Sequence, residues 1–124
     1  MNWEGLQAIA LGVAEARSLD QALTGIVQGL ARDPSTALVR IWLQKPGDCC
    51  DVCPLRDECP KNVDCLHLVA SAGQSLADPS VTWEGLDGRF SRFPLNSRKV
   101  GQVGGSGKPQ LLRFDSSDVT WSVD

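Results

Sequence analysis

The chain lacks several features on which common functions depend. Its 124 residues include a single histidine, His67, so no Ser/His/Asp triad can be recognised. The formal net charge is -3 and no long block of Lys and Arg occurs, which argues against direct nucleic-acid binding, because phosphate contacts require clustered cations. No apolar run approaches the roughly 20 residues that span a bilayer, so we expect neither a membrane anchor nor a signal peptide. These absences favour a cytoplasmic protein.

Cysteine is also absent from most of the chain, which makes its distribution informative. All five cysteines lie between Cys49 and Cys65, in a polar segment that contains proline. Thiolates are soft metal ligands and nucleophiles, so this concentration indicates a metal, an iron–sulfur cluster or a redox switch rather than core packing. Thiols stay reduced in the cytoplasm, where clustered cysteines bind metal more often than they pair as disulfides.

The spacing of these cysteines predicts a thiolate-liganded site. A C-x-x-C pair lets two sulfurs reach one metal from a tight turn, and two further cysteines complete a set of four. The predicted metal ligands are Cys50, Cys53, Cys59 and Cys65, with Cys49 or His67 as a substitute. Only one tight pair is present, where zinc knuckles usually have two, and two Cys-Pro steps are typical of cluster-binding runs. The sequence therefore leaves an iron–sulfur cluster and zinc both open as the cofactor.

Other interpretations of the same segment remain. Arg56 and Lys61 could lower a thiol pKa and favour disulfide exchange, and the cysteines could also be inert reduced thiols. His67 is interpreted first as a structural histidine on a strand, solvent-facing or partly buried. Asp57 and Glu58 are expected to be solvated in the loop.

Hydrophobic periodicity predicts an α+β fold. Apolar residues recur at helical spacing from 3 to about 17, and a second helix is expected to begin at a capping box, Ser18 to Gln21, and to end at Asp33-Pro34. Residues 37–44 and 66–73 alternate as strands. The cysteine-rich segment, residues 45–65, is therefore a long loop insertion between two strands.

The second half of the chain carries weaker signals. Residues 74–90 are expected to form a loop, followed by a short helix over 99–103 and a short strand over 111–114, after which the sequence is polar. Trp42 and Trp83 are candidate ligand-binding residues, because an indole can stack on a planar ligand.

Two motifs resemble those of a GAF domain. One is the Gly-x-x-Gly-x-x-Gly-x-Pro pattern of Gly101, Gly104, Gly107 and Pro109, and the other is the run Cys65-Leu-His-Leu68 after a cysteine-rich insertion. With the order of helices and strands, the resemblance covers nearly the whole chain and is closer to the amino-terminal GAF sensor of sigma-54-dependent bacterial activators. It implies one GAF-like domain, residues 1–124, with an antiparallel sheet and leading helices, incomplete at the C-terminus before the last strands and helix.

The resemblance also implies a function. Such domains sense redox state or a small molecule and pass the signal to an output domain, so the chain is expected to be a sensory input module and not an enzyme. A homodimer through the leading helix is expected, and a small-molecule effector is compatible with the family. Two alternatives stay open: a cysteine-based redox enzyme resembling GAF-type methionine sulfoxide reductase, and a metal-free module that binds a small effector.

Overall fold

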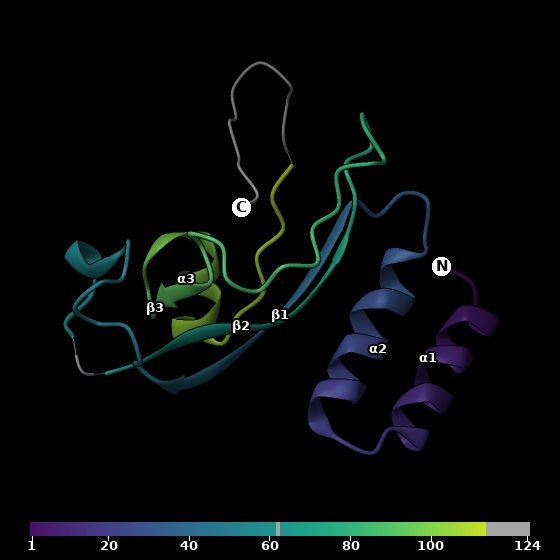
Figure 1. Ribbon diagram of the computed structural model, residues 1–124, viewed down its shortest axis with the longest axis horizontal. Helices are drawn as coiled ribbons and strands as arrows, with labels where there is room; N and C mark the ends of the chain where they lie inside the picture. Colours follow the sequence, from purple (N-terminus) through teal and green to yellow (C-terminus); the bar gives the residue numbers. More distant parts are fainter. Residues whose placement is uncertain (62, 114–124) are drawn as a thin grey trace. The chain divides into compact units, whose positions relative to one another are not determined.

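The computed structural model describes residues 1–61 and 63–113 of the chain (Figure 1). Two compact units are present. The first comprises Met1–Leu43 and Leu68–Leu86, and the second comprises Gln44–His67 and the residues from Asp87 on. Helices and strands both occur, which confirms the mixed α+β class. No helix in the described ranges is long and apolar enough to cross a bilayer.

The first unit begins with two helices, α1 (Trp3–Glu15) and α2 (Leu19–Ala31), which lie side by side (Figure 1). The predicted capping box is confirmed: Ser18 Oγ accepts from the Gln21 N–H at 3.0 Å, and Gln21 Oε1 accepts from the Arg17 N–H at 2.8 Å. The first contact satisfies an amide that a helix start leaves without an intrahelical partner, and the second fixes the residue that precedes the N-cap. The helix boundaries follow the sequence pattern within a few residues.

The apolar stripe of α2 packs on the sheet. The core cluster consists of Val27 from α2 with Ala70 and Ala72, and four partly buried residues surround it: Leu23, Ala31, Val39 and Ile41. The two alanines keep the strand surface low, so the α2 side chains can approach it closely. By contrast, α1 has no buried residue and packs against α2 through Ile9, which lies over Gly29.

The antiparallel sheet has three strands in the order β1-β2-β3. They are β1 (Leu38–Pro46), β2 (Asp64–Gly73) and β3 (Arg92–Pro94). The two predicted strands are confirmed, and each is longer than the sequence pattern indicated. The third strand was not predicted, because three residues are too few to show an alternating pattern. It pairs Leu66 with Phe93 and His67 with Arg92.

Helix α3 (Arg98–Ser106) is the last helix of the described residues and lies near β3 (Figure 1). A Cβ on Gly104 would lie 2.6 Å from Leu66 Cδ1, and a Cβ on Gly101 would overlap the Pro94 carbonyl oxygen. Gly107, with a φ of 67°, ends the helix in the left-handed conformation. The glycine pattern therefore serves close packing of a helix and its termination. The expected strand over 111–114 is wrong for residues 111–113, which are irregular, and Phe114 lies outside the described residues.

Candidate metal site

The loop between β1 and β2 and the start of β2 bring all five cysteines to one small cavity. Two hydrogen bonds join the ends of this loop. The Gly47 N–H donates to the Val63 carbonyl at 3.2 Å, and Gln44 Nε2 donates to Asp64 Oδ2 at 3.3 Å. The cavity has a volume of about 20 Å³ and is lined by Cys49, Cys50, Cys53, Cys59 and Cys65 together with Gly47, Asp48, Arg56, Val63, Arg92 and Pro94. Cysteines from a 17-residue stretch of sequence, Cys49 to Cys65, therefore line one cavity.

All five cysteines are free thiols, and they differ in burial. Cys53 and Cys65 are each only 8% exposed, and the other three are half-buried. Leu55 is buried, with 2% of its surface exposed, and anchors the loop. The Arg56 guanidinium donates to the Cys53 carbonyl at 3.1 Å. The segment after Cys53 is thus fixed by an apolar anchor and a backbone contact.

The environment of two of the thiols favours their protonated form. Burial, followed by the neighbouring Cys53 thiol, raises the pKa of Cys49 to about 11. Burial also raises the pKa of Cys65. A low thiol pKa is the property that makes a cysteine reactive in disulfide exchange. For these two residues the structure provides the opposite, which weakens the interpretation as a disulfide-exchange site.

Cys59 differs from the other cysteines in having a backbone amide that points at its sulfur. The Lys61 N–H donates to Cys59 Sγ at 3.4 Å. Lys61 adopts a φ of 67°, which is uncommon for a residue other than glycine.

Two ion pairs fasten the loop to elements that follow it in sequence. Asp48 accepts from Arg92 Nε and Nη2, both at 2.9 Å, and these hydrogen bonds lower the Asp48 pKa to about 2. Glu58 accepts from Ser97 Oγ at 2.6 Å and from Arg98 Nη2 at 3.0 Å. Glu58 is therefore held by α3 and its N-cap, whereas the sequence had suggested a solvated carboxylate. Sequence reasoning missed both pairs, because their partners are 44 and 40 residues apart.

His67 is buried on β2, with 6% of its surface exposed. Its Nδ1 lies 3.9 Å from Asp48 Oδ2, and its buried Nε2 has no hydrogen-bond partner within the described residues. Burial, followed by the charge of Arg92, lowers the His67 pKa, so the imidazole is neutral at pH 7. His67 is not among the residues that line the cysteine cavity, so its proposed role as a substitute ligand gains no support from this arrangement.

The sulfurs are gathered but not arranged as metal ligands. Within residues 1–61 and 63–113, no three His, Cys, Asp or Glu side chains form a ready metal-binding group. The donor set nevertheless fits a thiophilic metal, because every candidate ligand is a thiol and soft thiolates select zinc or iron–sulfur clusters. The polar loop would have to rearrange to bring four sulfurs to about 2.3 Å from one ion.

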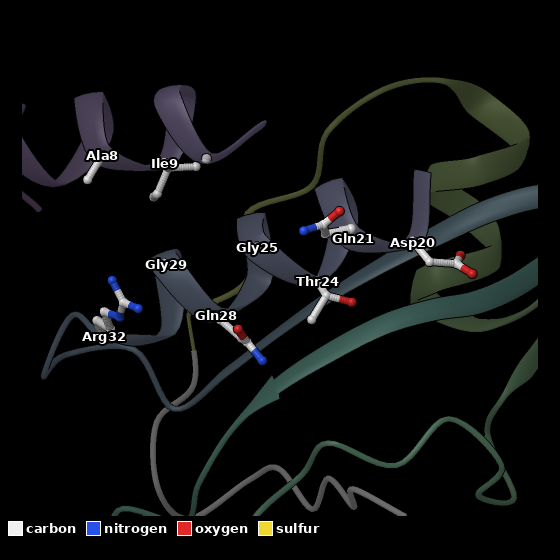
Figure 2. A pocket seen from close by; sticks show the side chains of 10 residues that line it. Ala8, Ile9, Asp20, Gln21, Thr24, Gly25, Gln28, Gly29 and Arg32 are labelled. Atoms are coloured by element: carbon white, nitrogen blue, oxygen red, sulfur yellow. The ribbon is translucent and has the colours of Figure 1, made fainter. Parts of the chain in front are cut away.

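A second hollow lies between α1 and α2 in the first unit (Figure 2). It is an open groove of about 480 Å³, and Figure 2 shows Ala8 and Ile9 on one side and, on the other, Thr24 and Gln28 of α2 with its C-cap residue Arg32. Trp42 on β1 and Trp83 in the segment after β2 are half-buried, and neither lines this groove or the cysteine cavity. Their proposed contact with a planar ligand stays a prediction.

The comparisons with known proteins leave the residues themselves as the basis for a function. No protein-family model matches the chain, and no curated protein or solved structure is similar to it.

Proposed function

We propose that the chain is a GAF-type sensory input domain whose cysteine loop holds a thiolate-liganded metal ion or iron–sulfur cluster, and that it controls the output domain of a bacterial signal-transduction or transcription regulator. One observation carries the proposal: four cysteines of a polar loop and one at the start of β2 line one cavity of about 20 Å³. Clustered thiols without a disulfide are typical of metal sites in reducing compartments.

The loop has the properties of a segment that a bound metal would order. Apart from Cys53 and Leu55, the residues from Gly47 to Val63 that the structure describes are exposed or half-buried. Such a segment gains little stability from apolar burial, whereas a structural zinc supplies about 10 kcal/mol or more in small peptides. Gain or loss of the cofactor would therefore change the order of the loop and of the elements to which Asp48 and Glu58 fasten it.

An enzymatic role has less support. Methionine sulfoxide reduction through cysteine exchange needs an accessible thiolate, and the cavity here is far smaller than the roughly 300 Å³ or more of a typical substrate pocket. Cys53 and Cys65 are buried, and burial raises the pKa of Cys65 and Cys49. We therefore propose binding and signalling, not turnover.

The metal-free alternative rests on the groove between α1 and α2, whose volume is within the range of small-ligand pockets. The same helix pair supports the proposed homodimer. Trp3 and Leu11 on α1 are 71% and 64% exposed, and an apolar helix face of this kind can be covered by a second copy.

The test of the metal proposal is anaerobic purification of the chain followed by metal, iron and acid-labile sulfide analysis. We expect close to one metal site per chain, with visible absorbance if the site holds iron. A colourless protein without bound metal, which also fails to take up zinc or to accept a reconstituted cluster, would contradict the proposal. Assays with methionine sulfoxide and a dithiol reductant would test the enzymatic alternative on the same sample.

A further inference from the structure

We infer that two copies of the chain pair through α1 in an antiparallel arrangement, with Trp3 of each copy seated on Ala14 of the other. This inference rests on the homodimer of the proposed function, and it names the surface, the direction and the register of the contact. The cysteine cavity takes no part in it.

Helix α1 is apolar on every side, yet none of its residues is buried. Glu4, Gln7 and Glu15 are the polar residues among its 13. A surface helix normally has a polar side, whereas a helix that is apolar all round normally lies in a core. Ile9 is half-buried where it lies over Gly29 of α2. Since α2 covers only that side, the composition of α1 requires a second cover.

The side of α1 that faces away from α2 has the pattern of a helix pair. Trp3, Gln7, Ala10 and Ala14 follow one another at spacings of four, three and four residues, which is the seam of a coiled coil. Large apolar residues flank this seam. The exposed fractions of the seam tryptophan and its flanking residues are 71% for Trp3, 64% for Leu11, 45% for Leu6 and 39% for Val13. These residues are the outer face of α1.

Large and small residues of the outer face match when the two helices run antiparallel. A shallow hollow of about 500 Å³ lies on α1 and is lined by Gln7, Ala8, Ala10, Leu11 and Ala14. Trp3 lies outside the hollow, at the first position of the helix. A two-fold axis between antiparallel helices sets Trp3 opposite Ala14 and Gln7 opposite Ala10, so each indole enters the hollow of the other copy. A parallel pair would crowd two indoles at one end and leave a gap between alanines at the other.

The charged residues favour the same direction. Glu4 lies in the first turn of α1 and Arg17 follows its last turn, and both are exposed. An antiparallel pair brings the Glu4 end of one copy to the Arg17 end of the other and places opposite helix-dipole ends together. Gln7, the polar residue of the seam, then lies close to the two-fold axis, where a polar seam residue fixes the register. Because α1 contains no Lys or Arg, an anionic lipid surface fits it less well than a second copy does.

The length of α1 sets the strength of the contact. At 1.5 Å per residue the helix is about 20 Å long, so the interface is smaller than the roughly 1,600 Å² of a standard complex. We therefore expect a monomer–dimer equilibrium with a Kd in the micromolar range. Sedimentation equilibrium of the full chain over about 1 μM to 1 mM, with the thiols kept reduced, measures it.

Substitutions on the outer face test the register. Trp3→Ala should raise the Kd at least about tenfold, because the two-fold axis repeats the lost contact. Leu111→Ala is the matched control, since Leu111 is 81% exposed but belongs to the second unit, and it should leave the Kd unchanged. Ala14→Leu should also weaken the dimer, because the added side chain fills the hollow that receives Trp3. A tighter dimer with Ala14→Leu would mean that the helices run parallel, and equal effects of Trp3→Ala and Leu111→Ala would overturn the assigned surface.

Photochemical cross-linking identifies the cover of α1 directly. Trp3 is replaced by photoreactive benzoylphenylalanine, and mass spectrometry of mixed light and ¹⁵N-labelled chains separates links within one chain from links between two. We expect links to residues 10–14 of a second chain. Links to the start of α1 in the second chain, links within one chain, or a monomer at every concentration would overturn the inference. Metal analysis of the same samples shows whether the cysteine site stands independently of that outcome.

Discussion

Gly101 shows how a single residue determines the packing of the second unit. A Cβ at this position would overlap the Pro94 carbonyl oxygen, and the backbone of β3 cannot move aside as a side chain can. Pro94 also lines the cysteine cavity. Gly101 must therefore be small because it contacts β3, and β3 borders the proposed metal site.

We expect Gly101→Ala to lower the free energy of unfolding by about 2 kcal/mol, because the added methyl group overpacks the contact between α3 and β3. Urea unfolding of the chain measures this change. Gly12→Ala is the matched control, since nothing lies within 4 Å of a Cβ at that helical position. It should stabilise α1 by about 1 kcal/mol through helix propensity alone. Equal effects of the two changes would contradict the packing argument.

Asp78 offers a titration test at the same scale, well away in sequence from the cysteines. Its carboxylate accepts from the Ser80 hydroxyl at 2.6 Å and from the Ser80 N–H at 3.2 Å, and these hydrogen bonds lower its pKa below the ordinary value of 3.8. Since the folded-state pKa is depressed, the contribution to stability is present above pH 3.8 and is lost as the pH falls through the folded-state value. In an NMR titration, Ser80→Ala should raise the Asp78 pKa toward 3.8. An unchanged Asp78 pKa in the variant would mean that the hydroxyl does not stabilise the carboxylate.

At the scale of elements, Glu58 joins the cysteine loop to α3. Ser97, the N-cap residue of α3, makes no side-chain cap within its own helix, because its hydroxyl donates to Glu58. Arg98 donates to the same carboxylate with a φ of 55° and lies over the Phe90 ring, 5.6 Å from its centroid. The carboxylate of Glu58 thus binds two side chains at the N-terminus of α3, where an anion is favoured.

We expect Glu58→Gln to speed hydrogen exchange in the first turn of α3, because the neutral amide cannot accept two charge-assisted hydrogen bonds from Arg98. Exchange in α1 and α2 should stay as it is. Asp57→Asn, one residue earlier, is the control for loss of charge in the loop, and it should leave α3 unaffected. If both variants change α3 equally, net charge rather than the specific contact explains the effect.

An element could be predicted from the sequence where its signal is a local pattern, and not where it depends on contacts between distant residues. The helices α1 and α2 were predicted because their apolar periodicity and the Ser18 capping box are local. Strand β3 was missed, since its three residues form a strand only by pairing with β2. The position of the cysteine site was likewise evident from composition. The ion pairs of Asp48 and Glu58 were not evident, because each joins distant parts of the sequence.

At the scale of the whole molecule, the described chain consists of two compact units with different sources of stability. The first has an apolar cluster around Val27, which is fully buried. The buried residues of the second include Leu55, two cysteines and Phe93, and its loop depends on ion pairs and, on the present proposal, on a metal. Removing the metal should therefore affect the two units unequally, because only the second draws folding free energy from the ion.

Hydrogen exchange of the zinc-loaded chain before and after treatment with a chelator measures this difference. We expect faster exchange in the loop between β1 and β2 and in the first turn of α3, with little change in α2 and in the β2 residues that contact Val27. Adding zinc back should restore the slow exchange, which separates loss of the ion from irreversible unfolding. Since the loop is fastened to β3 by Asp48 and to α3 by Glu58, loss of order should extend to those elements first. A uniform increase across both units would mean that the metal supports one cooperative fold, and a signal carried from the loop to α3 alone would then have no structural basis.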